Sequence, residues 1–150
     1  MDATLALQIL TIVVAASAPF IAFRHSRRLA LAHNRNAWLD ALRNDVAELI
    51  ALADDVATTT SQLLRGDEAQ KNQRASRLHG QTVELQAIRY RIRLRLRAGN
   101  RLHDDLIGSL FGSDMASPDP ETRHAWREAV VNSAETIIQK VWKDIETGRS

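Results

Sequence analysis

Residues 3–23 read ATLALQILTIVVAASAPFIAF and contain no charged side chain, and Arg24 and Arg27 follow directly. Because a helix rises about 1.5 Å per residue, this stretch is about 30 Å long, which is the thickness of a bilayer's hydrocarbon core. We therefore interpret Ala3 to Phe23 as a transmembrane helix that organises the rest of the chain.

A cleaved secretory signal is an alternative interpretation, because Ala16, Ser17 and Ala18 resemble a small-residue cleavage site. However, no basic residue precedes the apolar run, and Pro19 would follow the cut directly. The run is also longer than the apolar region of most signals. A buried or interfacial helix is the third alternative. Because Lys and Arg collect on the cytoplasmic side of a span, we expect residues 1–24 to form an anchor with its N-terminus outside and residues 25–150 to be cytoplasmic.

Composition limits the remaining residues to one modest domain. Cysteine is absent, which excludes disulfides and thiolate metal sites and is typical of a reducing compartment. The 20 basic and 18 acidic residues give a formal net charge of +2, so net charge favours no particular partner.

Helix-compatible residues without Gly or Pro extend from Arg24 to Arg65. Apolar or small residues recur within this stretch at spacings of three and four: Leu39, Leu42, Val46, Leu49, Ala53, Val56, Thr60 and Leu63. This heptad spacing predicts a long helix with a narrow seam for one or two partner helices. The polar residues 33–36 leave open whether one helix passes through or a new helix starts there.

A second helix is expected from Glu68 to Arg97, after a chain reversal at Gly66 and Asp67. Its last part, IRYRIRLRLR at residues 88–97, alternates as a strand would. No second strand is available to pair with it, and Leu85, Ile88 and Ile92 keep helical spacing, so we favour helix.

We expect a short helix from Leu102 to Leu110, a loop from Ser113 to Pro120, and a last helix from Pro120 to about Thr147 with Asp119 as its N-cap. The predicted fold is therefore all-α: an N-terminal transmembrane helix followed by an antiparallel helical bundle, made of a coiled-coil-like hairpin and a C-terminal helix. Residues 38–64 hold five acids and one Arg, whereas residues 71–101 hold nine bases and one acid. This charge difference predicts that the two helices of the hairpin attract each other.

Five arginines alternate through the second helix and form a candidate basic face: Arg89, Arg91, Arg93, Arg95 and Arg97. We weigh three roles for them, namely pairing with the acidic helix, contact with anionic lipid headgroups, and binding of nucleic acid. Tyr90 is the only aromatic residue in the run, which disfavours nucleic acid. Candidate core or interface anchors are Trp38, Leu42, Leu49, Trp126 and Trp142.

Catalytic and cofactor motifs are missing from the sequence: it has no phosphate loop, nucleophile elbow, zinc-binding HExxH or dinucleotide fingerprint. His103, Asp104 and Asp105 could begin a metal site, but no further ligands follow at a recognisable spacing. We therefore expect no enzyme activity, no cofactor and no metal.

Three stretches together carry a resemblance: NRNAWLDALRNDVAELI (residues 34–50), NRLHDDLIGSL (100–110) and IIQKVWKDIETG (137–148). With the apolar span, they resemble uncharacterised single-span membrane proteins of bacteria and their prophages that carry a cytoplasmic helical domain. The resemblance implies a single-pass protein of the bacterial inner membrane and assigns no catalytic residue.

The function we expect is a membrane-anchored interaction or scaffold module that acts through self-association or a cytosolic partner. One alternative is a small membrane-acting effector, such as a toxin or a phage-exclusion or defence protein. A third hypothesis is a membrane-tethered nucleic-acid binder.

Overall fold

A computed structural model describes the backbone of residues 3–65, 68–117 and 119–147. Its elements are α1 (Ala3–Arg65), α2 (Glu68–Arg95), α3 (Arg101–Leu110), the 3₁₀ turn η1 (Ser113–Ala116) and α4 (Pro120–Glu146). No strand occurs among the described residues, so the predicted all-α class is confirmed. The chain divides into two compact units, Met1–Ala37 and Trp38–Ser150.

In the first unit, the backbone of α1 is helical from Ala3 onward and continues without a break through the polar residues 33–36. The side chains of residues 3–21 lie outside the described residues, so the span from Ala3 to Phe23 stays a prediction. In the part of the chain that is described, no helix combines the length and the apolar character needed to cross a membrane.

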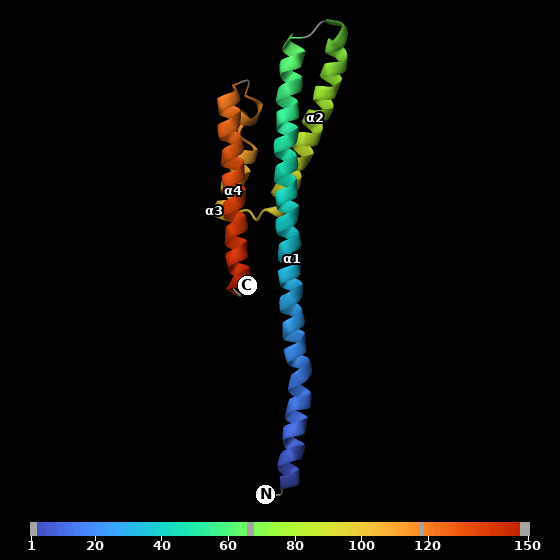
Figure 1. Cartoon of the computed structure of the whole chain (residues 1–150), viewed down its shortest axis with the longest axis vertical. Helices are drawn as coiled ribbons and strands as arrows, with labels where there is room; N and C mark the ends of the chain where they lie inside the picture. The colour runs from blue at the N-terminus through green and yellow to red at the C-terminus, as the bar shows by residue number, and fades with distance from the viewer. Residues whose placement is uncertain (1–2, 66–67, 118, 148–150) are drawn as a thin grey trace. The chain divides into compact units, whose positions relative to one another are not determined.

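In the second unit, α1 from Trp38 onward and α2 form an antiparallel pair (Figure 1). At one end, the indole Nε1 of Trp38 donates a hydrogen bond to the carbonyl oxygen of Arg95 at 3.1 Å. At the other end, Nη1 of Arg74 donates to the carbonyl oxygen of Gln62 at 2.9 Å. The helical interpretation of residues 88–95 and the antiparallel hairpin are thus confirmed, whereas the reversal at Gly66 and Asp67 lies outside the described residues.

The core of this unit collects apolar side chains from all four α-helices. Its buried members are Leu39, Leu42, Val46, Leu49, Ala53, Leu85, Ile88, Ile92, Leu96, Leu106, Leu110, Met115, Trp126, Val130, Ala134, Ile137 and Ile138. The predicted seam of α1 is followed as far as Val56, which packs against the core, and beyond it Thr59 is buried whereas Thr60 is exposed.

The helix α2 ends at Arg95, two residues before the predicted end at Arg97. The amide of Leu96 bonds back to the carbonyl of Arg93 at 3.1 Å, which tightens the last turn. Gly99 then adopts a φ of +78°, a left-handed conformation that is available to glycine at little cost. Asn100 follows as the N-cap of α3, and its side chain accepts a hydrogen bond from the amide of Leu102.

The predicted start of the last helix is confirmed. The carboxylate of Asp119 accepts hydrogen bonds from the amides of Glu121 and Thr122, and Pro120 occupies the first turn of α4. The loop predicted from Ser113 to Pro120 was wrong for its first four residues, because Ser113–Ala116 form η1. Met115 of this turn is 8% exposed and packs into the core, which accounts for the ordered turn.

Candidate functional site: the arginine segment of α2

The arginines at residues 89–95 do not form one basic face. Residues two apart on a helix differ in direction by about 200°, so alternating arginines point to different sides. Arg89 is only 7% exposed, whereas Arg93 is exposed. Arg89 is therefore buried together with Ile88, Ile92 and Leu96 and is not part of an exposed basic face.

Asp45 of α1 connects two of these arginines. Its side chain is 8% exposed, its Oδ1 lies 2.9 Å from Nε of Arg91, and its Oδ2 lies 2.5 Å from Nε of Arg95. Glu48, one turn further along α1, also pairs with Arg91. The predicted attraction between the acidic and basic helices is confirmed here, and because this acid is buried, the contacts fix the register of α1 on α2.

Arg89 has a different environment. Its guanidinium carbon Cζ lies 4.5 Å from the centroid of the Phe111 ring, and the Tyr90 ring meets Phe111 edge-on at 5.7 Å. Burial lowers the pKa of Arg89, and the proximity of Tyr90 opposes this shift. Its buried Nε has no hydrogen-bond partner, and no carboxylate in the described part of the chain pairs with it. Arg89 is thus a buried cation that lies against an aromatic ring.

Arg97 lies beyond the end of α2, and its backbone rather than its charge is engaged. Its amide donates a hydrogen bond to Nδ1 of His103 at 2.8 Å, so this ring nitrogen carries no proton. The His103 ring stacks on Trp38 with centroids 6.3 Å apart. Burial lowers the pKa of His103, Lys140 adds to the shift, and Asp104 opposes it. These contacts join the end of α2 to α1 and α3.

Most of the predicted interface anchors lie inside the bundle. Leu42 and Leu49 are 0% exposed, and Trp126 is buried with its Nε1 donating to the carbonyl of Ser109 at 2.9 Å. Trp38 is half-buried, and Trp142 is 38% exposed. In this fold Leu42, Leu49 and Trp126 hold the bundle together and are not available to another chain.

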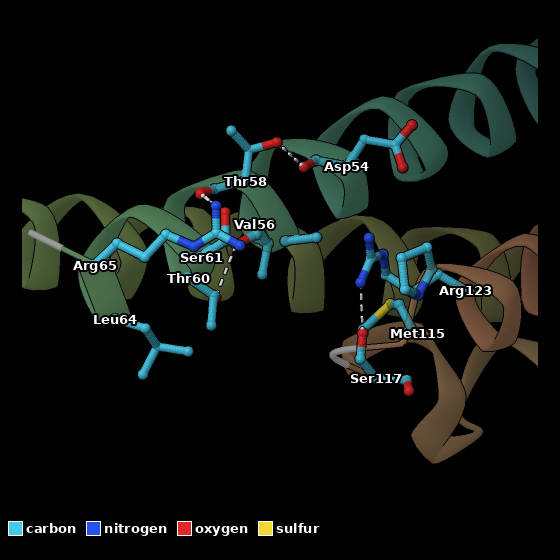
Figure 2. A pocket seen from close by; sticks show the side chains of 12 residues that line it. Asp54, Val56, Thr58, Thr60, Ser61, Leu64, Arg65, Met115, Ser117 and Arg123 are labelled. Atoms are coloured by element: carbon cyan, nitrogen blue, oxygen red, sulfur yellow. Dashed lines mark hydrogen bonds between the residues drawn. The ribbon is translucent and has the colours of Figure 1, made fainter.

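A pocket of about 660 Å³ lies between the end of α1 and the segment from Met115 to Arg123 (Figure 2). The hydroxyls of Thr58 and Ser61 donate to carbonyls of their own helix, at 2.9 Å and 2.8 Å. Nη1 of Arg123 donates to the carbonyl of Ser117 at 2.8 Å on the opposite wall. The hydroxyls of Thr58 and Ser61 and the Arg123 guanidinium are thus bonded to backbone carbonyls, and Asp54 at the edge of the pocket is paired with Arg127.

A second pocket, of about 320 Å³, lies beside Arg89 and is called the Arg89 pocket below. Its lining residues are Ala53, Val56, Thr82, Leu85, Gln86, Arg89, Phe111, Gly112 and Met115. Sequence reasoning missed this pocket. Thr82, Leu85 and Arg89 share one face of α2 by their spacing, but no spacing rule brings Phe111 to that face.

Among the described residues, no group of three or more His, Asp or Glu side chains is placed to hold a metal ion. No family model, curated protein or solved structure matches the chain. The resemblance to single-span proteins of bacteria and prophages therefore stays a prediction.

Proposed function

We propose that this chain is a membrane-tethered helical interaction module without catalytic activity, and that α2 docks an acidic amphipathic helix of a cytosolic protein. The proposed tether is the uncharged stretch from Ala3 to Phe23. The basic residues that follow it support a single span of a bacterial inner membrane, with the helical bundle on the cytoplasmic side.

The observation that carries the docking proposal is an apolar stripe on the outside of α2. It consists of Val83, Ala87, Tyr90 and Leu94, called the outer stripe below. Val83 is 56% exposed, Tyr90 54% and Leu94 87%. Their spacing of four, three and four places them on one helix face, opposite the face that buries the core residues of α2. Single exposed apolar residues are ordinary, but an aligned row is typical of a helix-binding surface.

The charges around this stripe favour an acidic partner. Arg93 lies beside Leu94 on α2, is exposed, and has its Cζ 5.7 Å from the Phe111 ring centroid. Arg97 is also exposed, and no ion pair to either arginine is found among the described residues. A partner helix with carboxylates beside its apolar row would neutralise these charges on docking, whereas a second α2 would bring like charges together.

The fate of the other arginines supports this choice over nucleic acid or lipid. Arg91 and Arg95 are neutralised by Asp45 and Glu48, and Arg89 is buried. Phosphate backbones and anionic headgroups require several accessible cations close together. Only Arg93 and Arg97 of the run are both exposed and outside these ion pairs, which suits one partner helix better than an extended polyanion.

The docking proposal is tested with a synthetic helix of about four heptads that carries Leu at positions a and d and Glu at e and g. Binding to the labelled full chain is followed by fluorescence anisotropy. We expect Leu94→Ser to weaken binding about 10-fold or more, because a buried leucine contributes about 1.5–3 kcal/mol. The matched control is Leu64→Ser on α1, which is 79% exposed and outside the stripe.

Three results would overturn the docking proposal. The first is equal binding of a peptide with Lys at e and g, and the second is an unchanged affinity in Leu94→Ser. The third is self-association of the full chain that Leu94→Ser abolishes, which would assign the outer stripe to a second copy. Growth arrest that requires residues 3–23 and survives Leu94→Ser would favour the membrane-acting effector instead.

The tether is tested separately. The sequence contains no cysteine, so a single cysteine introduced near Ser150 gives a specific label for topology. We expect a membrane-impermeant maleimide to react only after the cells are permeabilised. Labelling in intact cells would contradict the proposed orientation, and extraction of the protein by alkaline carbonate would contradict the tether.

A further inference from the structure

We propose that the Arg89 pocket binds a small organic anion, with its carboxylate paired to the guanidinium of Arg89 and its apolar body filling the remaining space. This inference concerns a different surface from the outer stripe and does not depend on the docking proposal. It rests on an unpaired buried cation, on the volume of the pocket, and on the chemistry of its walls.

Arg89 is buried but has no carboxylate partner among the described residues. Arg91 and Arg95 both meet carboxylates although they are more exposed than Arg89. Arg89 is 7% exposed, its Nε has no hydrogen-bond partner among the described residues, and its guanidinium carbon lies 4.5 Å from the centroid of the Phe111 ring. A buried charge without a counter-ion is costly, and a bound anion would remove much of that cost.

The Arg89 pocket is large enough for a small molecule. Three elements form it: α1 through Ala53 and Val56, α2 through Thr82 to Arg89, and the turn after α3 through Phe111 to Met115. Its volume of about 320 Å³ lies at the lower end of the range for small-molecule sites, about 300–1,000 Å³. A compact ligand can therefore enter beside Arg89 without any change in the helix packing.

The walls define the class of ligand. Of the described residues that line the pocket, only Arg89 is charged, and most of the others are apolar. The hydroxyl of Thr82 donates to the carbonyl of Leu78 at 2.8 Å, so its proton is already used. One fork-shaped guanidinium matches one carboxylate, whereas a phosphate dianion would need more donors than this lining offers. The apolar walls favour a hydrocarbon body.

The experiment uses the full chain and three probes: hexanoate, hexanol and inorganic phosphate. Binding is followed by the amide signals of Phe111 and Gly112 in ¹H–¹⁵N NMR spectra. We expect hexanoate to bind and to shift these signals, and both hexanol and phosphate to bind at least about 10-fold more weakly, because each lacks one of the two interactions.

Two variants and one control separate the pocket from general effects. Arg89→Met keeps the length and apolar stem of the side chain, and we expect hexanoate to bind it about 10- to 100-fold more weakly. Thr82→Phe narrows the pocket from an exposed position and should also abolish binding while Arg89 is intact. Arg77→Met, at an exposed position of the same helix outside the pocket, should bind normally.

The proposal is overturned if Arg89→Met keeps the wild-type preference for hexanoate over hexanol, because Arg89 would then not be the group that binds the carboxylate. It is equally overturned if phosphate binds as well as hexanoate, or if no probe shifts the Phe111 and Gly112 signals. If Arg89→Met fails to fold, Thr82→Phe decides: unchanged hexanoate binding in that variant refutes the pocket as the site.

Discussion

Asp45 is the residue whose replacement best tests how the hairpin is held in register. Asp45→Asn keeps the size of the side chain but removes the negative charge that Arg91 and Arg95 share. An amide also has only one acceptor oxygen in place of two, so one of the two arginines loses its contact with residue 45. The variant therefore removes the charge of Asp45 from the contact between α1 and α2 without opening a cavity.

The magnitude follows from the number of contacts and their exposure. A hydrogen bond to a charged group contributes about 1.5–3 kcal/mol. Asp45 accepts one from Nε of Arg95 and also forms an ion pair with Nε of Arg91. The side chains of Arg91 and Arg95 are 44% and 32% exposed, so water can replace part of the loss. Glu48 also stays paired to Arg91. We expect Asp45→Asn to lower the free energy of unfolding by about 2–3 kcal/mol.

The assay is urea denaturation of the purified full chain, followed by far-UV circular dichroism. The matched control is Asp54→Asn, whose ion pair with Arg127 joins side chains that are 51% and 38% exposed, and which should cost less than about 1 kcal/mol. In a double-mutant cycle, Asp45→Asn and Arg95→Met should show a coupling energy of at least about 1 kcal/mol. Equal costs for Asp45→Asn and Asp54→Asn would refute the reasoning.

Two further predictions concern the core and the pH dependence. Leu106→Ala removes a side chain that is 0% exposed and should lower the free energy of unfolding by about 2–5 kcal/mol. The control Leu64→Ala, at a position that is 79% exposed, should change it by less than about 0.5 kcal/mol. Similar losses for the two variants in urea denaturation would contradict the assigned core. Burial lowers the pKa of His103 in the folded chain below its ordinary value of 6.5. The unfolded chain therefore binds a proton at His103 more readily than the folded chain does. The free energy of unfolding should fall as the pH drops from 6.5 to the lowered pKa of the folded state. In His103→Gln this pH dependence should disappear, and an unchanged pH profile of thermal unfolding would assign it to another group.

The sequence by itself determined the helices and most of their ends. Spacings of three and four marked the buried side of α1 as far as Val56, and Asp119 followed by Pro120 marked the start of α4. These features are local, because capping and periodicity depend on residues within one or two turns. The acid and base contrast between the hairpin helices also predicted their pairing, since it needs only complementary charge. The prediction of a membrane span from Ala3 to Phe23 likewise rests on local composition alone.

The tertiary structure alone decided what each arginine does. Helix geometry alone sends the alternating arginines of α2 to different sides, but the packing decides their contacts: Arg91 and Arg95 face Asp45, Arg93 is exposed, and Arg89 lies under Phe111. That difference depends on where the turn after α3 packs, and this turn is held in place by burial of Leu110 and Met115. Burial sums contacts from segments far apart in the sequence, so the spacing that places Arg89 on one face with Leu85 does not reveal that Phe111 covers it or that it has no carboxylate partner among the described residues.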